Sequence, residues 1–406
     1  MRVGILWHVV YPWDIRMEKI IKVLTDDGHE VHLVCKGKEK LPEFEDCGAL
    51  KIYRIGGRPV LGSRALGRLV GLPVPINPYW YVKARRAFRN AGIECLIVRD
   101  LPIALLAGVL GKRLGIPVFF DMAENYPAAL VAYNKNIYKP FLFGNGWLPK
   151  QYEKWSLRYM KHVFVVAEEQ IERLVRVGVD RNRMSVVMNT PDVEYYLDRA
   201  RESGQPANAG ETVLLYIGKV DAHRGIEVAV RAMPSIVARC PDAKLVLVGD
   251  GTEKRRLERL AAELGVVDRV TFVGWVSFDK VPGLIAGSTV CLIPHARSEH
   301  TETTIPNKIF DYMTFAKPVV VSDCAPLRRI VGETNCGKVF RSGDVRDLAD
   351  KIVDLLTDAN RKAMGENGRK AIAERYHWRR DAQLLLARVK DAHDGAAVPV
   401  NVNAGT

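Results

Sequence analysis

The sequence lacks the features that mark membrane-spanning, secreted and zinc-binding proteins. No apolar run approaches the roughly 20 residues of a spanning helix, and no signal-peptide pattern follows Met1. The seven cysteines include no Cys-x-x-Cys pair and have no histidine cluster nearby, which indicates buried free thiols rather than disulfides or zinc ligands. Together these absences predict a cytoplasmic protein.

Two motif absences narrow the choice of ligand. The net charge of +13 favours an anionic partner, but charge alone does not choose among nucleic acid, an acidic membrane and a phosphorylated small molecule. The basic residues are dispersed and follow no nucleic-acid recognition motif, so we expect no nucleic-acid partner. The dinucleotide fingerprint Gly-x-Gly-x-x-Gly, typical of NAD-dependent dehydrogenases, follows neither candidate first strand; the residues there are His8-Val9-Val10 and Gly218-Lys219-Val220.

The apolar pattern predicts two α/β domains, since 406 residues are long for one compact core. Short apolar runs alternate with helical patterns, which is typical of parallel sheets covered by helices on both faces. In the first series the expected strands are residues 2–9, 31–35, 95–98, 117–120, 162–166 and 185–188. In the second series they are residues 213–217, 244–248, 270–273, 290–293 and 318–321.

The domain limits follow from composition. Residues 199–211 are rich in Gly, Ala, Ser and Pro and have no apolar periodicity, so they predict a linker between domains 1–198 and 212–375. We expect a helix within 376–393 that packs back on the N-terminal domain, followed by a disordered tail, residues 394–406. Two Rossmann-like domains in tandem would bind a ligand at the carboxyl ends of their strands.

The most informative stretch is residues 294–318. Thr303 and Thr304 precede Pro306, a pattern that predicts a capped helix start directly after a strand. Such a start offers free N–H groups and a positive dipole end to a phosphate. Lys308 and Asp311 would share one face of this helix, where the cation reaches a phosphate and the carboxylate accepts from ribose hydroxyls. A solvated amphipathic helix explains the same residues, taken alone, equally well.

Two further loops support an anion site at the same rim. Gly218 allows close backbone approach after the first strand of the second domain, and Lys219 and Arg224 follow it. Gly249 and Gly251 form another tight turn after a strand. Each loop alone is more often a surface turn, but three loops at one rim predict a diphosphate pocket.

These motifs resemble the nucleotide-sugar-binding domain of glycosyltransferase family 4, of GT-B fold. The similarity covers about residues 214–341 and rests on a Gly-Lys/Arg-x4-Lys/Arg-Gly loop, a strand ending in VGDG, the strand VTFVGWV and a Glu-x7-Glu element. The resemblance implies that Lys219 and Arg224 contact the pyrophosphate. It also implies that Asp311 replaces the second motif glutamate on the ribose, and that the backbone near residues 273–276, which include Trp275, borders the base.

The sequence departs from the family pattern at the first motif glutamate. Thr303 occupies that position, and the neighbouring Glu302 is the candidate replacement. The stretch TETTIPNKIFDYM is similar to a sub-branch of the family that makes surface polysaccharides. The expected activity is therefore a transferase acting in polysaccharide or glycolipid biosynthesis.

The N-terminal domain carries a second departure. Asp121 and Glu124 follow an expected strand in a segment similar to the family's Asp-x-His-Glu-x-Tyr-Pro element, but Ala123 replaces the histidine. Either carboxylate could orient an acceptor hydroxyl or stabilise charge on the sugar, although an acidic residue here is as often a helix cap. Arg16 either reaches the phosphates or belongs to a surface helix.

The chemistry expected from these residues needs no resident cofactor. No Asp-x-Asp metal pair is present, so protein cations would stabilise the departing diphosphate of a UDP- or GDP-linked donor. The resemblance implies retention of the anomeric configuration by front-face attack. The alternatives are a sugar-nucleotide epimerase of the same fold and a catalytically silent sugar-nucleotide binding module.

The acceptor is expected to be a glycan or a lipid-linked sugar. A basic, aromatic segment in residues 58–89 could rest on an anionic membrane, although packing of a helix against the sheet explains its apolar residues equally well. Its members are Leu61, Arg64, Leu66, Arg68, Leu69, Leu72, Tyr79, Trp80, Tyr81, Lys83, Arg85, Arg86 and Phe88.

Overall fold

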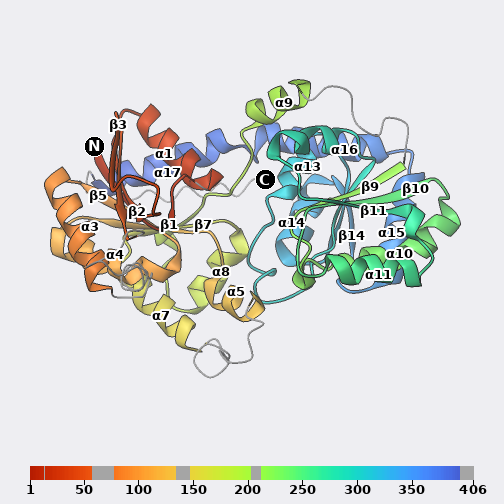
Figure 1. Cartoon of the computed structure of the whole chain (residues 1–406), viewed down its shortest axis with the longest axis horizontal. Helices are drawn as coiled ribbons and strands as arrows, with labels where there is room; N and C mark the ends of the chain where they lie inside the picture. The colour runs from red at the N-terminus through yellow and green to blue at the C-terminus, as the bar shows by residue number, and fades with distance from the viewer. Residues whose placement is uncertain (13, 57–76, 134–146, 203–211, 394–406) are drawn as a thin grey trace. The chain divides into compact units, whose positions relative to one another are not determined.

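The computed structural model describes residues 1–12, 14–56, 77–133, 147–202 and 212–393 (Figure 1). The chain forms two compact α/β units. The first unit consists of Met1–Met188 together with Asp381–Thr406, and the second of Asn189–Arg380. The predicted fold class, two Rossmann-like domains with parallel sheets, is confirmed.

The first unit is built on an eight-stranded sheet in the order β3-β4-β2-β1-β5-β6-β7-β8. All neighbouring strands are parallel except β3, which runs antiparallel to β4. The strands are β1 (Arg2–Val10), β2 (Glu30–Lys36), β3 (Phe44–Cys47), β4 (Leu50–Ile55), β5 (Cys95–Arg99), β6 (Val118–Met122), β7 (His162–Val165) and β8 (Met184–Val186).

Helices cover both faces of this sheet, with α3, α4 and α7 on one face and α1 and α17 on the other (Figure 1). Their bounds are α1 (Ile15–Asp26), α3 (Pro78–Ala91), η1 (Leu101–Ile103), α4 (Ala104–Leu114), α5 (Tyr126–Tyr133), α7 (Trp147–Leu157), α8 (Glu168–Arg176), η2 (Arg181–Arg183) and α17 (Trp378–His393).

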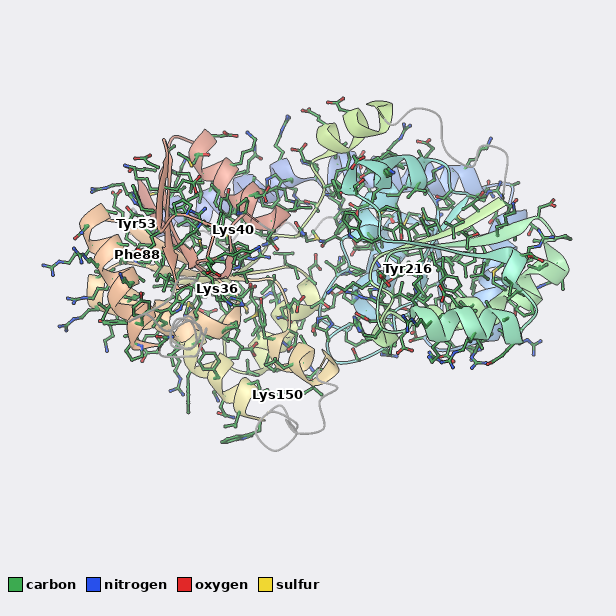
Figure 2. All side chains as sticks on the ribbon, viewed as in Figure 1. Lys36, Lys40, Tyr53, Phe88, Lys150 and Tyr216 are labelled. Atoms are coloured by element: carbon green, nitrogen blue, oxygen red, sulfur yellow. The ribbon has the colours of Figure 1, made fainter. Side chains whose placement is uncertain are left out.

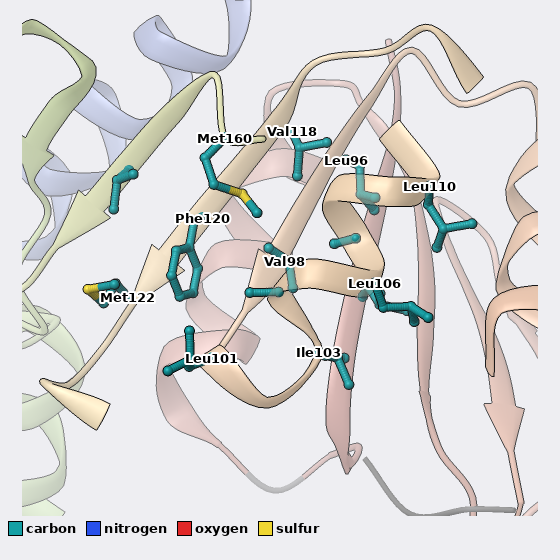
Figure 3. Close-up of a cluster of buried hydrophobic side chains, with 14 of the residues drawn as sticks. Leu96, Val98, Leu101, Ile103, Leu106, Leu110, Val118, Phe120, Met122 and Met160 are labelled. Atoms are coloured by element: carbon teal, nitrogen blue, oxygen red, sulfur yellow. The ribbon is translucent and has the colours of Figure 1, made fainter. Parts of the chain in front are cut away.

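Local signals explain where these helices begin and what they bury. Asp14 caps α1 by accepting a hydrogen bond from Met17 N at 2.9 Å. Asn77 and Pro78 begin α3, and Gly92 ends it in the left-handed conformation. The apolar side of α4 packs on β5 and β6, and Figure 3 shows the resulting cluster of buried side chains, among them Leu96, Val98, Leu106, Leu110, Val118 and Phe120.

The second unit is built on a six-stranded parallel sheet in the order β11-β10-β9-β12-β13-β14. Helices α10, α11 and α15 cover one face and α13 and α16 the other (Figure 1). The strands are β9 (Thr212–Ile217), β10 (Ala243–Val248), β11 (Val270–Gly274), β12 (Val290–Ile293), β13 (Val319–Ser322) and β14 (Gly337–Phe340). The helices are α9 (Val193–Glu202), η3 (Ala222–Arg224), α10 (Ile226–Arg239), α11 (Lys254–Glu263), η4 (Val267–Arg269), η5 (Phe278–Lys280), α12 (Val281–Ala286), α13 (Lys308–Thr314), α14 (Ala325–Thr334), α15 (Val345–Thr357) and α16 (Arg361–Glu374).

The domain limits differ from those expected. Helix α9 continues to Glu202, so residues 199–202 of the expected linker are helical, and the compact units divide between Met188 and Asn189 rather than at 198. From Asp381 onward, α17 groups with the first unit, where Lys390 pairs with Asp27 at 2.7 Å. The rest of the expected linker, 203–211, and the expected tail, 394–406, lie outside the described residues.

All seven cysteines are free thiols in the structure. Two of them differ from the expected burial, because Cys47 is exposed and Cys240 is half-buried. Within the described part of the chain, no helix is both long and apolar enough to cross a bilayer.

Candidate active site

The candidate site lies where the strand order of the second sheet reverses. The chain proceeds from β9 outward to β10 and β11, then returns to the other side of β9 with β12. Loops that leave the carboxyl ends of β9 and β12 therefore turn in opposite directions, and the crevice between two such loops is the usual ligand position in sheets of this kind. The predicted loops after β9, β10 and β12 all start at this edge.

Backbone packing holds the glycine loops against one another. Gly218 N donates to Val248 O at 2.9 Å, which ties the β9 loop to the end of β10. A Cβ on Gly249 would lie 2.0 Å from Gly218 O, and one on Gly251 would lie 2.3 Å from Val220 O. The structure thus brings together the three glycines that the sequence singled out, and these contacts exclude any side chain at the two positions after β10.

Three cations stand around the β9 loop. Lys219 is exposed and Arg224, in the turn η3, is half-buried. Lys308 begins α13 and reaches back under the loop, where its Nζ lies 4.1 Å from the centre of the Tyr216 ring. Tyr216, which is labelled in Figure 2, is fully buried within the second unit. The predicted grouping of Lys308 with the β9 loop is present in the structure, and Tyr216 supplies a π-face for the ammonium that sequence reasoning missed.

Histidines complete the cluster. Burial lowers the pKa of His295 well below its usual value, and the neighbouring charges of Lys308 and Arg224 lower it further. Burial, followed by Arg224, lowers the pKa of His223 to about 4. Burial likewise lowers the pKa of Lys308, with Arg224 adding to the effect and Asp311 opposing it. The positive charges here repel one another, so an anion entering the crevice would relieve that repulsion.

The helix start was predicted too early. Helix α13 begins at Lys308 rather than at Pro306, and Thr303 and Thr304 do not cap it. Their hydroxyls donate back to carbonyls of Glu299 and His300, at 2.9 Å and 2.7 Å, because the preceding loop folds into successive turns. These threonines therefore stabilise the loop before α13. The sequence feature that indicates this role is the run of short polar residues, since Ser and Thr side chains often bond to nearby backbone groups.

The remaining donor-side residues lie in the loop after β12, on α13 and in the loop after β11. Glu302 pairs with Arg297 at 2.9 Å, so the proposed replacement for the motif glutamate is engaged by a neighbouring cation. Asp311 is half-buried in the first turn of α13. Trp275 follows β11 and is 77% exposed, which leaves its indole face open to a planar ligand.

In the first unit the predicted site residues form a buried ion network. Asp121 has no exposed surface and accepts from Arg16 Nη2 at 2.5 Å and from Arg99 Nη1 at 3.0 Å. Burial raises the pKa of Asp121, but the charges of Arg16 and Arg99 outweigh it and hold that pKa below its usual value. Arg99 also donates to Asp14 Oδ2 at 3.0 Å.

This network corrects two predictions. Arg16 is 2% exposed and its Nη1 donates to Met188 O at 3.0 Å, so its side chain neither reaches out to phosphates nor lies on the exposed face of α1. Asp121 cannot receive an acceptor hydroxyl, because both of its oxygens are used by buried guanidinium groups. Glu124 is half-buried in the loop after β6, and it remains the accessible carboxylate of the pair.

The exposed face of α3 carries much of the basic segment noted in the sequence. Lys83, Arg86 and Arg89 are exposed, while Trp80 and Phe88 are buried against the sheet. A shallow hollow of about 460 Å³ lies along this face, lined by Tyr81, Val82, Arg85, Arg86, Arg89 and Asn90. The aromatic residues thus divide between core and surface. Leu61, Arg64, Leu66, Arg68, Leu69 and Leu72 lie outside the described residues.

Comparison with known proteins agrees with this geometry. The family described as "Glycosyl transferases group 1" matches residues 211–358, and the "Glycosyl transferase 4-like domain" matches residues 15–190. Each match lies mainly within one of the two units, and the first contains the glycine loops and Lys308.

Individual relatives extend the comparison along the chain. The 2-deoxystreptamine glucosyltransferase of Streptomyces kanamyceticus is 24% identical over 392 residues, 92% of this chain and 97% of that protein. The alpha-D-kanosaminyltransferase of the same organism is 29% identical over 165 residues, 40% of this chain and only 42% of that protein's length. The solved structure of Anabaena HepE in complex with UDP is similar in fold, with a TM-score of 0.70 at 15% identity over 96% of this chain and 100% of that one.

Proposed function

We propose a specific reaction for this chain, which belongs to the group 1 glycosyltransferases: transfer of a sugar from a nucleoside-diphosphate sugar to a hydroxyl acceptor, with retention at the anomeric carbon. In this proposal the protein's own cations take the part that a divalent ion plays in other transferases. UDP is the favoured carrier, since the structurally similar HepE binds it. GDP is the second choice.

The observation that carries the proposal is the group of cations at the carboxyl ends of β9 and β12. Lys219, Arg224 and Lys308 enter no ion pair with a carboxylate among the described residues, whereas Arg16, Arg99, Arg173 and Arg329 each do. A site that concentrates positive charge, with no carboxylate in an ion pair with any of these three cations, is suited to a pyrophosphate.

The chemical step follows from that charge. The bond between the anomeric carbon and the β-phosphate oxygen breaks, and both of its electrons leave with the diphosphate. A new bond forms between the anomeric carbon and the acceptor oxygen on the same face, and the hydroxyl proton passes to the departing phosphate oxygen. Lys219 and Arg224 stabilise the extra negative charge on the leaving group, and Asp311 accepts hydrogen bonds from the ribose.

The acceptor side belongs to the first unit in this proposal. Glu124 orients the acceptor hydroxyl, while the buried Arg16–Asp121 pair fixes the neighbouring strand ends. The acceptor is a glycan or a lipid-linked sugar of a surface polysaccharide or glycolipid. The basic face of α3, with the 61% exposed Val82 between its cations, would rest on an anionic membrane.

The test begins with thermal-shift screening against UDP- and GDP-sugars, followed by transfer assays with the donor that stabilises the protein. We expect Lys219→Ala and Arg224→Ala each to lower turnover roughly 100-fold, as removal of a charge-stabilising group worth about 3 kcal/mol does elsewhere. The matched control is Lys112→Ala with Arg113→Ala, two exposed cations at the end of α4. Unchanged transfer by a Lys219→Ala, Arg224→Ala double variant would remove the proposal. Diphosphate release that needs an acceptor separates a transferase from an epimerase or a silent binding module.

A further inference from the structure

Arg224 has an unusual partner for a half-buried guanidinium. Its Nη1 lies 3.3 Å from His295 Nε2, and this is the one hydrogen bond that its side chain makes among the described residues. Its Nε is buried and has no hydrogen-bond partner there. The side chain is therefore held at one corner by an imidazole, and no carboxylate of the described residues takes up its charge.

The direction of this hydrogen bond determines the tautomer and the charge of the His295 ring. A guanidinium has N–H donors and no acceptor, so His295 Nε2 must accept the hydrogen bond. The imidazole then carries its proton on Nδ1 and is uncharged. Burial and the surrounding cations lower the pKa of His295, which agrees with a neutral ring at physiological pH.

The backbone aligns the two residues before any ligand arrives. Ala296 N donates to His223 O at 3.1 Å, which joins the loop after β12 to the turn that carries Arg224. A Cβ on Gly225, at a φ of 66°, would lie 1.8 Å from Pro294 O, so only glycine permits this approach. The carbonyl of His295 accepts from Ser342 Oγ at 3.2 Å, which ties the same loop to the end of β14.

We infer that His295 is a positioning residue that holds the Arg224 guanidinium toward the donor's diphosphate through an uncharged acceptor, leaving the positive charge of Arg224 undiminished. The inference rests on the proposed function, because it assigns the charge of Arg224 to the pyrophosphate. It adds a residue that none of the family motifs quoted above contains.

An uncharged imidazole suits the position beside Arg224 better than a carboxylate would. Aspartate or glutamate would make a shorter and stronger bond to Arg224, but its negative charge would cancel the attraction that the site offers to an anion. A neutral acceptor supplies the orientation alone. Lys308 and His223 face the same ring, and neither adds a negative charge.

The test compares two side chains of equal size at position 295. In His295→Gln the amide oxygen can take the place of Nε2, and in His295→Glu the same position carries a charge. Binding is measured by calorimetry with inorganic pyrophosphate and with UDP, using the full-length chain. We expect His295→Gln to stay within about threefold of the wild-type affinity. We expect His295→Glu to bind both ligands at least about tenfold more weakly. Its carboxylate would neutralise Arg224, and the ligand's phosphate would lose a charge-assisted contact.

A double variant tests whether His295 acts through Arg224. His295→Leu should weaken pyrophosphate binding about tenfold, and adding it to Arg224→Ala should cause no further loss. Additive losses would overturn the inference, as would equal affinities of the Gln and Glu variants. If one variant fails to fold, the others still decide the question, with melting temperature as the check.

His162→Gln is the matched control. His162 is also a buried histidine, 3% exposed and hydrogen-bonded to Ser185 Oγ at 2.9 Å, but it lies in the first unit. Its replacement should lower stability without changing pyrophosphate affinity. If the wild-type protein binds neither pyrophosphate nor any nucleotide sugar, the proposed function itself fails. If the wild type binds and the variants do not follow the expected order, only the role of His295 fails.

Discussion

Lys308 and Gly218 are in direct contact, although 90 positions separate them in the chain: a Cβ added to Gly218 would lie 2.6 Å from Lys308 Nζ. The lysine occupies the space that any other residue at 218 would need. The absence of a side chain is therefore what allows the ammonium to lie over the Tyr216 ring, beneath the loop that faces the crevice.

This contact predicts the effect of Gly218→Ala. The methyl group must displace Lys308, and alanine rarely adopts the φ of 141° at this position, so we expect diphosphate affinity to fall about tenfold with a modest loss of stability. Gly332→Ala is the control, since Gly332 lies exposed in α14 with nothing within 4 Å of its added Cβ. That change should stabilise the protein by about 0.5–1 kcal/mol. Calorimetry with UDP and thermal unfolding measure both effects, and unaltered binding by Gly218→Ala would contradict the first.

The buried network of the first unit predicts a loss of stability rather than of chemistry at Asp121. Asp121→Asn leaves the guanidinium groups of Arg16 and Arg99 without their shared counter-charge, so the free energy of unfolding should fall by about 3–5 kcal/mol. Glu124→Gln should leave stability almost unchanged and lower transfer. Urea unfolding and turnover measured on both variants separate the two roles, and a stable but inactive Asp121→Asn protein would restore the catalytic interpretation of Asp121.

The buried His162 predicts part of the loss of the protein's stability at acidic pH. Burial, with smaller effects from Arg388 and Arg183, lowers the pKa of His162 from 6.5 to about 4. Between these pH values the unfolded chain binds a proton that the folded chain does not, so this contribution is complete above pH 6.5 and is lost as the pH falls toward 4. The loss amounts to about 3 kcal/mol. Melting temperatures from pH 4 to 8 should fall less steeply for His162→Gln than for the wild type, and parallel curves would disprove the assignment.

The basic face of α3 predicts binding to anionic lipid. Arg86→Glu with Arg89→Glu should abolish co-sedimentation with phosphatidylserine vesicles at low salt, since each cation near such a surface contributes about 1 kcal/mol. Lys112→Glu with Arg113→Glu makes the same change of charge on α4 and should leave binding intact. Absence of vesicle binding by the wild type would refute membrane contact altogether.

Much of the fold could be predicted because its strands are short, buried and rich in β-branched residues. Strands such as Val290–Ile293 are buried on both faces and appear in the sequence as continuous apolar runs. Strand β3 was missed, because Phe44–Cys47 is an exposed, acidic edge strand with almost no apolar signal, and the neighbouring β4 was not predicted either. Strand β14 was missed since it has four residues and begins with glycine.

The candidate site could be predicted only where its residues belong to local motifs. The glycines and cations of the β9 loop were found from their spacing, and Lys308 from its place after a strand. The partners of Arg16 were not predicted, because its ion pair with Asp121 joins positions 105 residues apart and leaves no local sequence pattern. His295 was missed for the same reason, since its role depends on Arg224, 71 residues earlier.

The last helix has a consequence for how the protein is made. Helix α17 begins in the second unit, yet from Asp381 it belongs to the first, where Leu385 and Val389 are completely buried. The ribosome therefore finishes the whole second unit before it supplies the segment that covers this part of the first. During synthesis, the apolar surface of the first unit that Leu385 and Val389 cover is therefore exposed until α17 is made. A chain cut before Asp381 would keep that surface exposed and would aggregate.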